Sequence, residues 1–351
     1  MLTYIILLML ILITYILLYK ILKLKNCKKY FCIIVFLLFT IMQGFRAIDI
    51  GSDTEKYVKF YNLSKNFSLI EILLCKNWVI EPGYGLLMKL IVTLNIPSQV
   101  FLIIVAAVIN GGFTYFIYKE SKDPLISTII FLGAEFFILS FTALRQMIAV
   151  MLILNSFKYI KQKKLFKFIC MVLLASTFHK TALIFLPAYF FKDIKITKKV
   201  MLFCLIVFFI VQLIGIPVLT FLIKQFYYDS YLISTGGGFT QTLVILVYLL
   251  FGLYFYKHVE RENHILYIFI YIAFLIQSLA CRINMAGRLM WYYYIFLVIF
   301  LPMIIEKISS KKLFNKNYIN IIKIGIIGTF IIQYLFFSIN MYNVLPYSTF
   351  L

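Results

Sequence analysis

The sequence predicts an all-α, polytopic integral membrane protein that forms a single transmembrane domain over residues 1–351. Its composition supports this class, because 64% of the residues are hydrophobic and only 13% are charged. A soluble globular domain carries about twice that share of charge. Apolar runs recur along the whole chain, and each approaches the roughly 20 residues that cross a bilayer core as a helix. The runs are continuously apolar, without the period-two alternation of a membrane β-barrel.

The distribution of charge excludes some functions. The net charge of +21 lies mostly on lysines in short links between apolar runs, as in cytoplasmic loops, and not in one basic patch. We therefore expect a lipid bilayer, and no nucleic acid, as the surroundings of this chain. The six cysteines form neither a CxxC pair nor a His/Cys ligand pattern, so the sequence predicts no metal site and no cofactor.

The lysine links also set the expected topology. Residues 1–22 lack the basic first region and the cleavage site of a signal peptide, so we interpret them as a span whose N-terminus is outside. The lysines at 23–29 then mark the first inner link. Continued along the chain, this pattern predicts about 12 spans with both termini outside. They cover residues 2–22, 31–46, 98–118, 125–160 (two), 165–191 (two), 200–223, 241–257, 264–281, 289–305 and 319–338.

Two apolar regions are predicted to be hairpins. As one helix, residues 125–160 would extend about 54 Å, nearly two bilayer cores. We therefore expect a hairpin with TALRQ (142–146) at its outer tip. In the region 165–191, a hairpin keeps the lysine runs on both sides of it at the inner face. Its outer tip would carry His179 and Lys180.

The longest interruption of the apolar pattern is an extracytoplasmic loop at residues 46–84. It holds five of the 13 carboxylates of the chain: Asp49, Asp53, Glu55, Glu71 and Glu81. Ser52 or Asp53 is expected to cap a helix over DTEKYVKFY. A short apolar run follows Pro82 and stops at Asn95, which is too short to cross a bilayer and predicts a surface or re-entrant helix.

The arginines suggest the chemistry of the site. Only five of the 34 basic residues are arginine, and four of these lie at the predicted outer face: Arg46, Arg145, Arg282 and Arg288. The positive-inside rule predicts the opposite placement for residues that only orient spans. Because a guanidinium binds phosphate through paired donors, we interpret the four as a clamp for a diphosphate. The alternative is that each arginine reaches lipid headgroups or pairs with an outer carboxylate.

Candidate acid–base residues lie on the same side. His179 is suited to take a proton from a sugar hydroxyl near neutral pH, with a structural hydrogen bond at a hairpin tip as the alternative. Asp53 is either a second candidate base or a helix cap. Glu81 is either part of this catalytic group or a charge at the start of the following helix.

The ordered motifs resemble a known family. They are FRAIDIGSDTEKYVKFY (45–61), EPGYGLLMKLI (81–91), LRQMIAVMLIL (144–154), KQKKLFKF (161–168), STFHKTALIFLPAYF (176–190) and RINMAGRLMWYY (282–293). Each motif is short, but their order and spacing resemble the EpsG family of exopolysaccharide polymerases, related in role to Wzy-type O-antigen and capsule polymerases. The likeness covers nearly the whole chain.

The resemblance implies a GT-C-like glycosyltransferase of the bacterial cytoplasmic membrane, with its active site on the extracytoplasmic side. It would join undecaprenyl-diphosphate-linked oligosaccharide repeat units, without a nucleotide sugar. A chain-length regulator and a flippase are candidate partners. An O-antigen ligase-like transferase and a flippase or transporter of the same lipid-linked oligosaccharides are the alternatives. A transporter would favour ionisable residues near mid-span, whereas the charges noted here lie at span ends.

These considerations give each candidate residue a role. The catalytic group comprises Asp53, His179 and Glu81, with Asp53 or His179 as the base. Arg145 with Arg282 or Arg288 would hold the donor diphosphate, and Arg46 would bind the second diphosphate or organise the loop aspartates. The complete predicted substrate-binding set is Arg46, Asp49, Tyr57, Arg145, Gln146, Arg282 and Arg288.

Overall fold

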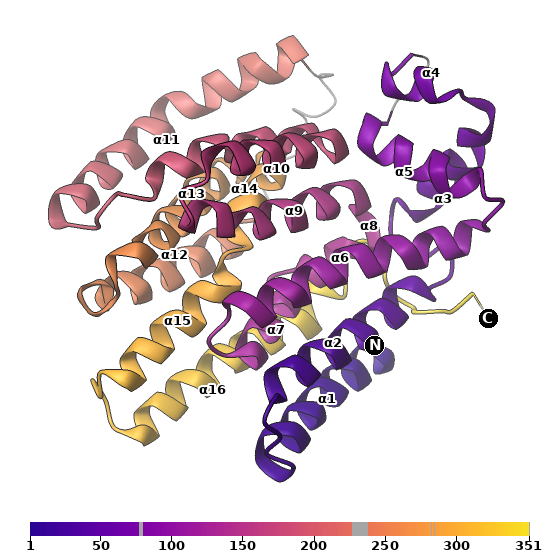
Figure 1. Cartoon of the computed structure of the whole chain (residues 1–351). Coiled ribbons are helices and arrows are strands. Elements are labelled where there is room, and N and C mark those ends of the chain that lie inside the picture. The colour runs from indigo at the N-terminus through magenta and orange to yellow at the C-terminus, as the bar shows by residue number, and fades with distance from the viewer. Residues whose placement is uncertain (77–79, 227–237, 282, 284, 351) are drawn as a thin grey trace.

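The structure is a computed structural model that describes residues 1–76, 80–226, 238–281, 283 and 285–350. This part of the chain is almost entirely helical, and its only bridge of β type joins Arg46 to Thr349. Figure 1 shows most of the long helices side by side, running roughly along one direction. The prediction of an all-α chain is confirmed.

Six helical segments of the described chain are long and apolar enough to cross a membrane. These are Leu2–Ile21 (α1 with η1), Cys27–Gly44 (α2), Ser98–Glu120 (α6), Lys198–Gly215 (in α11), Arg261–Ala280 (η6 with α13) and Lys316–Phe336 (α16 with part of η7). The number rises to eight if two bent helix pairs each form one span. By length and composition, the structure therefore supports six to eight spans and does not confirm the predicted 12.

Most of the difference arises from short helices in the regions predicted as hairpins, and the predicted span 241–257 is also short in the structure. In the first, α7 (Pro124–Gly133) and α8 (Phe136–Thr142) form a pair bent by 52°, and α9 (Leu144–Lys161) follows. In the second, α10 (Leu165–Phe178) is followed by the 3-10 helix η3 (Lys180–Phe191). The expected break at His179 is confirmed, because its backbone is extended (φ −156°). Neither α10 nor η3 alone meets the length of a span.

The second half of the chain packs around a buried aromatic centre. Its helices are α11 (Lys198–Phe226), α12 (Phe239–Tyr254), α13 (His264–Ala280), α14 (Met285–Tyr294), α15 (Leu297–Ser310) and α16 (Lys316–Ile332). Tyr292, Tyr293 and Tyr294 of α14 are almost completely buried. In contrast, α11 lies at the edge of the bundle (Figure 1), and its first 18 residues contribute no buried side chain. A bilayer would cover its exposed Phe203 and Phe209.

The loop over residues 46–84 folds as small helices beyond one end of the bundle (Figure 1). They are α3 (Thr54–Leu63), η2 (Ser64–Asn66), α4 (Leu69–Leu73) and the start of α5 (Pro82–Val92). The predicted helix after Asp53 is confirmed. Asp53 occupies the N-cap position, but its side chain accepts no capping hydrogen bond. The short apolar helix α5 is also present, and the chain turns at Asn95 (φ 55°).

The C-terminal segment anchors this loop, a contact that the sequence did not indicate. Ala47 N–H donates to the Ser348 carbonyl oxygen at 3.0 Å, and Ser52 N–H donates to that of Tyr342 at 3.0 Å. Gly51 has φ 92°, and a Cβ there would lie 2.6 Å from the Phe141 carbonyl oxygen. Only glycine therefore fits where the loop passes closest to α8.

Candidate functional site

A cavity of about 680 Å³ lies where the loop, the α8–α9 break, the end of α10, the start of α12, α14 and the C-terminal segment meet. Its volume falls within the range of sites that bind small molecules. Its lining includes the acidic side chains of Asp53 and Glu135, the guanidiniums of Arg145 and Arg288, and the imidazole of His179. Side chains from distant parts of the chain thus converge on one space that holds both acidic and basic groups.

Glu81 connects two of these residues from behind the cavity wall. One of its carboxylate oxygens pairs with the Arg145 guanidinium, and the other lies 2.9 Å from His179 Nδ1. The Glu81 side chain is only 11% exposed and does not line the cavity. With Nδ1 occupied by the carboxylate, Nε2 is the His179 nitrogen that remains to accept a proton.

Glu81 remains ionised over a wide pH range. Burial alone would raise its pKa, but the hydrogen bond from His179 and the charge of Arg145 together lower the pKa to about 2. The carboxylate is therefore a permanent negative charge near neutral pH. It favours the His179 tautomer that carries its proton on Nδ1.

Local sequence explains how Glu81 reaches His179. Glu81 occupies the N-cap position of α5, and Pro82 is suited to the first helical turn. A Cβ on Gly83 would lie 2.3 Å from Thr177 Oγ1. Because glycine has no Cβ, α5 can approach α10 this closely, two residues before His179. The EPG sequence thus provides the contact that joins the two residues.

Arg145 is partly committed to the protein. It lies in the first turn of α9, pairs with Glu81 and sits over the Tyr57 ring, with Cζ 5.9 Å from the ring centre. Pairing with a carboxylate was the alternative to phosphate binding, and it is observed here. Arg145 nevertheless lines the cavity, and its side chain is 29% exposed. A ligand would share this guanidinium with Glu81.

Arg288 has no such partner among the residues that the structure describes. It is exposed at the cavity, and no carboxylate lies within ion-pair distance of it in the described parts of the chain. The Gln146 amide donates to the Arg288 carbonyl oxygen at 2.7 Å, which ties α9 to α14 and fixes the backbone that carries this arginine. Gln146 itself also lines the cavity.

Arg46 has a different setting. It is completely buried and does not line the cavity. Its guanidinium donates to the carbonyl oxygens of Gln43, Ile50 (3.3 Å) and Phe141 (3.1 Å). These bonds join the end of α2, the loop and the end of α8. In the structure, Arg46 thus bonds to the protein backbone and has no contact with the cavity.

Some of the remaining predicted residues line the cavity, and others lie outside it. Asp53 and Tyr57 line the cavity, and Asp53 Oδ1 lies 2.9 Å from Lys56 Nζ. Asp49 is exposed and outside the cavity lining. Arg282 lies outside the described residues. Of the four arginines proposed as a clamp, the structure thus brings Arg145 and Arg288 to one cavity.

Glu135 is the charged cavity residue that the sequence analysis did not predict. It connects α7 and α8 at their 52° bend and has a left-handed backbone (φ 70°), which is uncommon for glutamate. Within the described chain, no hydrogen bond or ion pair reaches its carboxylate. An informative signal was present, because Glu135 is a lone carboxylate inside the apolar region 125–160. Gln241, Gln277 and Tyr342 complete the polar lining and were also not predicted.

No cluster suited to a metal ion is found in the parts of the chain that the structure describes, where no three His, Cys, Asp or Glu side chains lie together. The polar groups of the cavity are guanidiniums, amides, hydroxyls, an imidazole and separated carboxylates. Such a set can bind phosphates and sugar hydroxyls through hydrogen bonds.

A sequence model of the EpsG family matches residues 29–349. The chain belongs to the EpsG family. The match covers every residue that lines the cavity, and it confirms the resemblance inferred from the motifs. Membership points to a membrane protein of polysaccharide biosynthesis. No curated protein and no solved structure matches this EpsG-family chain.

Proposed function

We propose that this EpsG-family protein is a polysaccharide polymerase, a glycosyltransferase that joins undecaprenyl-diphosphate-linked oligosaccharide repeat units to build O-antigen, capsule or exopolysaccharide. The bond between sugar C1 and the lipid diphosphate breaks, and C1 bonds to an acceptor hydroxyl. The hydroxyl proton passes to a protein base, and the lipid diphosphate leaves. One observation carries the proposal: His179, held by Glu81, shares a cavity with Arg145 and Arg288.

The two arginines suit the leaving group. Negative charge builds on the diphosphate as the C1–O bond breaks, and positioned guanidiniums stabilise that charge. Glu81 already offsets the charge of Arg145, whereas Arg288 has no acidic partner in the described chain. Arg288 therefore provides most of the attraction for the diphosphate, and Arg145 directs it. Arg46 instead stabilises the loop from within the fold.

His179 is the better candidate for the base. Its Nδ1 faces Glu81, which leaves Nε2 to accept the hydroxyl proton. Asp53 is 41% exposed, and its carboxylate already pairs with Lys56. We assign to Asp53 and Glu135 the hydrogen bonds that orient the acceptor sugar, with Tyr57 and Gln146 completing the wall.

We further propose that the short helices cross the bilayer, which gives about 12 spans in a GT-C-like arrangement. A 3-10 helix rises about 2.0 Å per residue, so the 12 residues of η3 extend about 24 Å instead of about 18 Å. The helix α9 begins at the cavity and ends at a lysine run. Lysine runs lie on the cytoplasmic side of a membrane. The cavity, at the opposite end of α9, would then face the outer side of the cytoplasmic membrane.

Reconstitution of the purified protein tests this function. Proteoliposomes would receive one lipid-linked repeat unit, and the products would be scored as a glycan ladder and as released undecaprenyl diphosphate. We expect both products, in equal amounts per bond formed. Release of the lipid diphosphate without a ladder would contradict polymerisation. A ladder of unchanged length with the double variant His179→Ala, Arg288→Gln would contradict the assigned site.

A transporter of the same lipid-linked oligosaccharides is a second candidate. The bent pair α7–α8 with Glu135 at its break favours this reading, because transporters bind substrates at broken helices. The two functions give different products. A transporter would move an intact repeat unit across the proteoliposome membrane, and cells without it would accumulate repeat units inside. Cells without a polymerase would still display single units at the surface.

A further inference from the structure

His179 lies at a junction whose geometry depends on the helix η3. It belongs to neither α10 nor η3, because its backbone is extended (φ −156°). Its N–H donates to the Ala175 carbonyl oxygen, and its own carbonyl oxygen accepts from the Ala182 N–H, each at 3.0 Å. The position of the imidazole therefore depends on where η3 begins. The contact between His179 Nδ1 and Glu81 depends on it as well.

Two neighbouring tyrosines of α14 bind η3 from the side. The Tyr292 hydroxyl lies 2.9 Å from the side-chain oxygen of Thr181, two positions after His179. The next residue of α14 is Tyr293, whose hydroxyl donates to the Ile184 carbonyl oxygen at 2.7 Å. Both tyrosines are almost completely buried, and neither lines the cavity. Tyr292 thus holds a side chain close to the proposed base, whereas Tyr293 holds the backbone further along η3.

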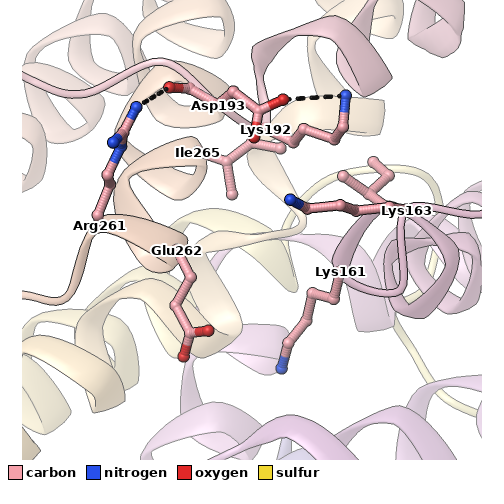
Figure 2. A pocket seen from close by; sticks show the side chains of 8 residues that line it. Lys161, Lys163, Lys192, Asp193, Arg261, Glu262 and Ile265 are labelled. Atoms are coloured by element: carbon pink, nitrogen blue, oxygen red, sulfur yellow. Dashed lines mark hydrogen bonds and ion pairs between the residues drawn. The ribbon is translucent and has the colours of Figure 1, made fainter.

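The opposite end of η3 has an anchor of its own. Residues 160–163, 192–193 and 261–265 line a recess of about 430 Å³ there, and Figure 2 shows Arg261 reaching Asp193 in it. Arg261 Nη2 donates to the Asp193 carbonyl oxygen at 3.2 Å, two residues after η3 ends. Because η3 has 12 residues, it extends about 24 Å. Of these three contacts, the one at Thr181 therefore lies closest to His179 along the chain.

The helix α14 also carries Arg288, which links Tyr292 to the other half of the site. Arg288 and Tyr292 are four positions apart, so they lie on the same side of the helix, about one turn from each other. The Gln146 amide fixes this turn through its bond to the Arg288 carbonyl oxygen. Tyr292 thus joins the segment of His179 to the helix that holds the proposed diphosphate ligand.

We propose that Tyr292 is a positioning residue, which sets the place of His179 relative to Arg288 through its hydrogen bond to Thr181. Glu81 holds the imidazole from α5, and Tyr292 holds the adjoining segment from α14. A base must lie within hydrogen-bond reach of the reacting hydroxyl, so a displacement of about 1 Å lowers the rate strongly. The effect on catalysis rests on the proposed function, whereas the effect on the conformation of His179 does not.

Matched variants of the two tyrosines test the proposal in the ladder assay. Tyr292→Phe should lower kcat about tenfold, the effect of one lost hydrogen bond, with KM unchanged because Arg145 and Arg288 remain in place. Tyr293→Phe removes a similarly buried hydroxyl from the same helix and should keep kcat. Equal effects of the two changes on kcat would show that Tyr292 only stabilises the core, and would overturn the proposal.

Thr181 completes a double-mutant cycle with Tyr292. Thr181→Val removes the hydroxyl but keeps the shape of the side chain, and it should lower kcat as much as Tyr292→Phe does. The double variant should be no slower than either single variant, because both changes remove the same contact. Thr181→Ser keeps a hydroxyl and should retain most of the rate. Losses that multiply in the double variant would overturn the proposal.

A measurement without substrate separates this proposal from the polymerase function. The chain holds three histidines, so nitrogen NMR of protein with labelled histidine reports which His179 nitrogen carries the proton, and His179→Ala assigns the signal. Tyr292→Phe should lower the share of His179 protonated on Nδ1, and Tyr293→Phe should not. An unchanged His179 signal in both variants would overturn the proposal. If the signal responds as expected but the unmodified protein forms no ladder, the positioning role is supported and the polymerase function fails.

Discussion

Glu81 and His179 lie 98 positions apart in the chain, yet His179 Nδ1 is 2.9 Å from Glu81 Oε1. The second oxygen of the same carboxylate pairs with Arg145. One buried carboxylate therefore holds both the proposed base and one of the proposed diphosphate ligands. A change at Glu81 should disturb both groups, whereas a change at either partner should disturb one.

The first prediction separates these effects. His179→Ala should lower kcat by about 10²–10⁴-fold, the usual contribution of a general base, with little change in KM. Glu81→Gln should lower kcat and also raise KM, because it releases Arg145 as well as His179. Both constants would be measured in the ladder assay. Glu55→Gln, an exposed position on α3, serves as control, and a Glu81→Gln variant as active as this control would refute the coupling.

The pKa of Glu81 predicts how stability depends on pH. Its pKa falls from an ordinary 4.5 to about 2 in the folded protein. A depressed carboxyl pKa contributes stability above pH 4.5, and this contribution is lost as the pH falls toward 2. The shift corresponds to about 3 kcal/mol. Thermal unfolding in detergent between pH 5 and pH 2 should show this loss, and Glu81→Gln should show a flatter profile. Identical profiles would contradict it.

Gly83 is predicted to be intolerant of a side chain. The Cβ of Gly83→Ala would lie 2.3 Å from Thr177 Oγ1 and 2.9 Å from the Thr177 carbonyl carbon. Overpacking of this kind costs about 1–3 kcal/mol and should separate Glu81 from His179, so both the melting temperature and the polymerisation rate should fall. Gly325→Ala is the control, since nothing lies within 4 Å of its Cβ position. That change should be neutral or slightly stabilising.

Arg288 and Arg46 should respond in opposite ways. Arg288→Gln should lower the rate about 10²–10³-fold with an unchanged melting temperature, because the side chain is exposed at the cavity. Arg46→Gln should lower the melting temperature, because it leaves buried carbonyl oxygens without donors. Thermal unfolding and ladder assays on both variants test the contrast. A destabilised Arg288 variant with normal specific activity would contradict the assignment.

Glu135 should show a conflict between stability and activity. Its carboxylate is largely buried without an ion pair in the described chain, which is costly for the charged form. Glu135→Gln should therefore keep or raise the melting temperature. It should also lower kcat, because an amide is a poorer hydrogen-bond partner than a carboxylate for the hydroxyls of the incoming sugar. Full activity together with reduced stability would show that Glu135 only supports the helix bend.

Local signals in the sequence predicted much of the secondary structure. Long apolar runs predicted the helices, since a bilayer requires each spanning segment to satisfy its own backbone hydrogen bonds. The candidate caps Ser52 and Asp53 predicted the start of α3. The lysine runs on both sides of residues 165–191 predicted a hairpin, and with it the break at His179. Motif order was sufficient to predict the family. The same reasoning did not assign meaning to Glu135, because a single carboxylate gives no periodic signal.

Only the tertiary structure decided which residues share a site. Arg46 and Arg145 are both arginines near the ends of apolar runs, yet packing buries Arg46 among backbone carbonyls and turns Arg145 to the cavity. The bond between Glu81 and His179 depends on a close contact between α5 and α10. The sequence by itself thus determined the membrane class, the helices and the residue types available for chemistry. Their partners depend on contacts between distant segments, which no local pattern encodes.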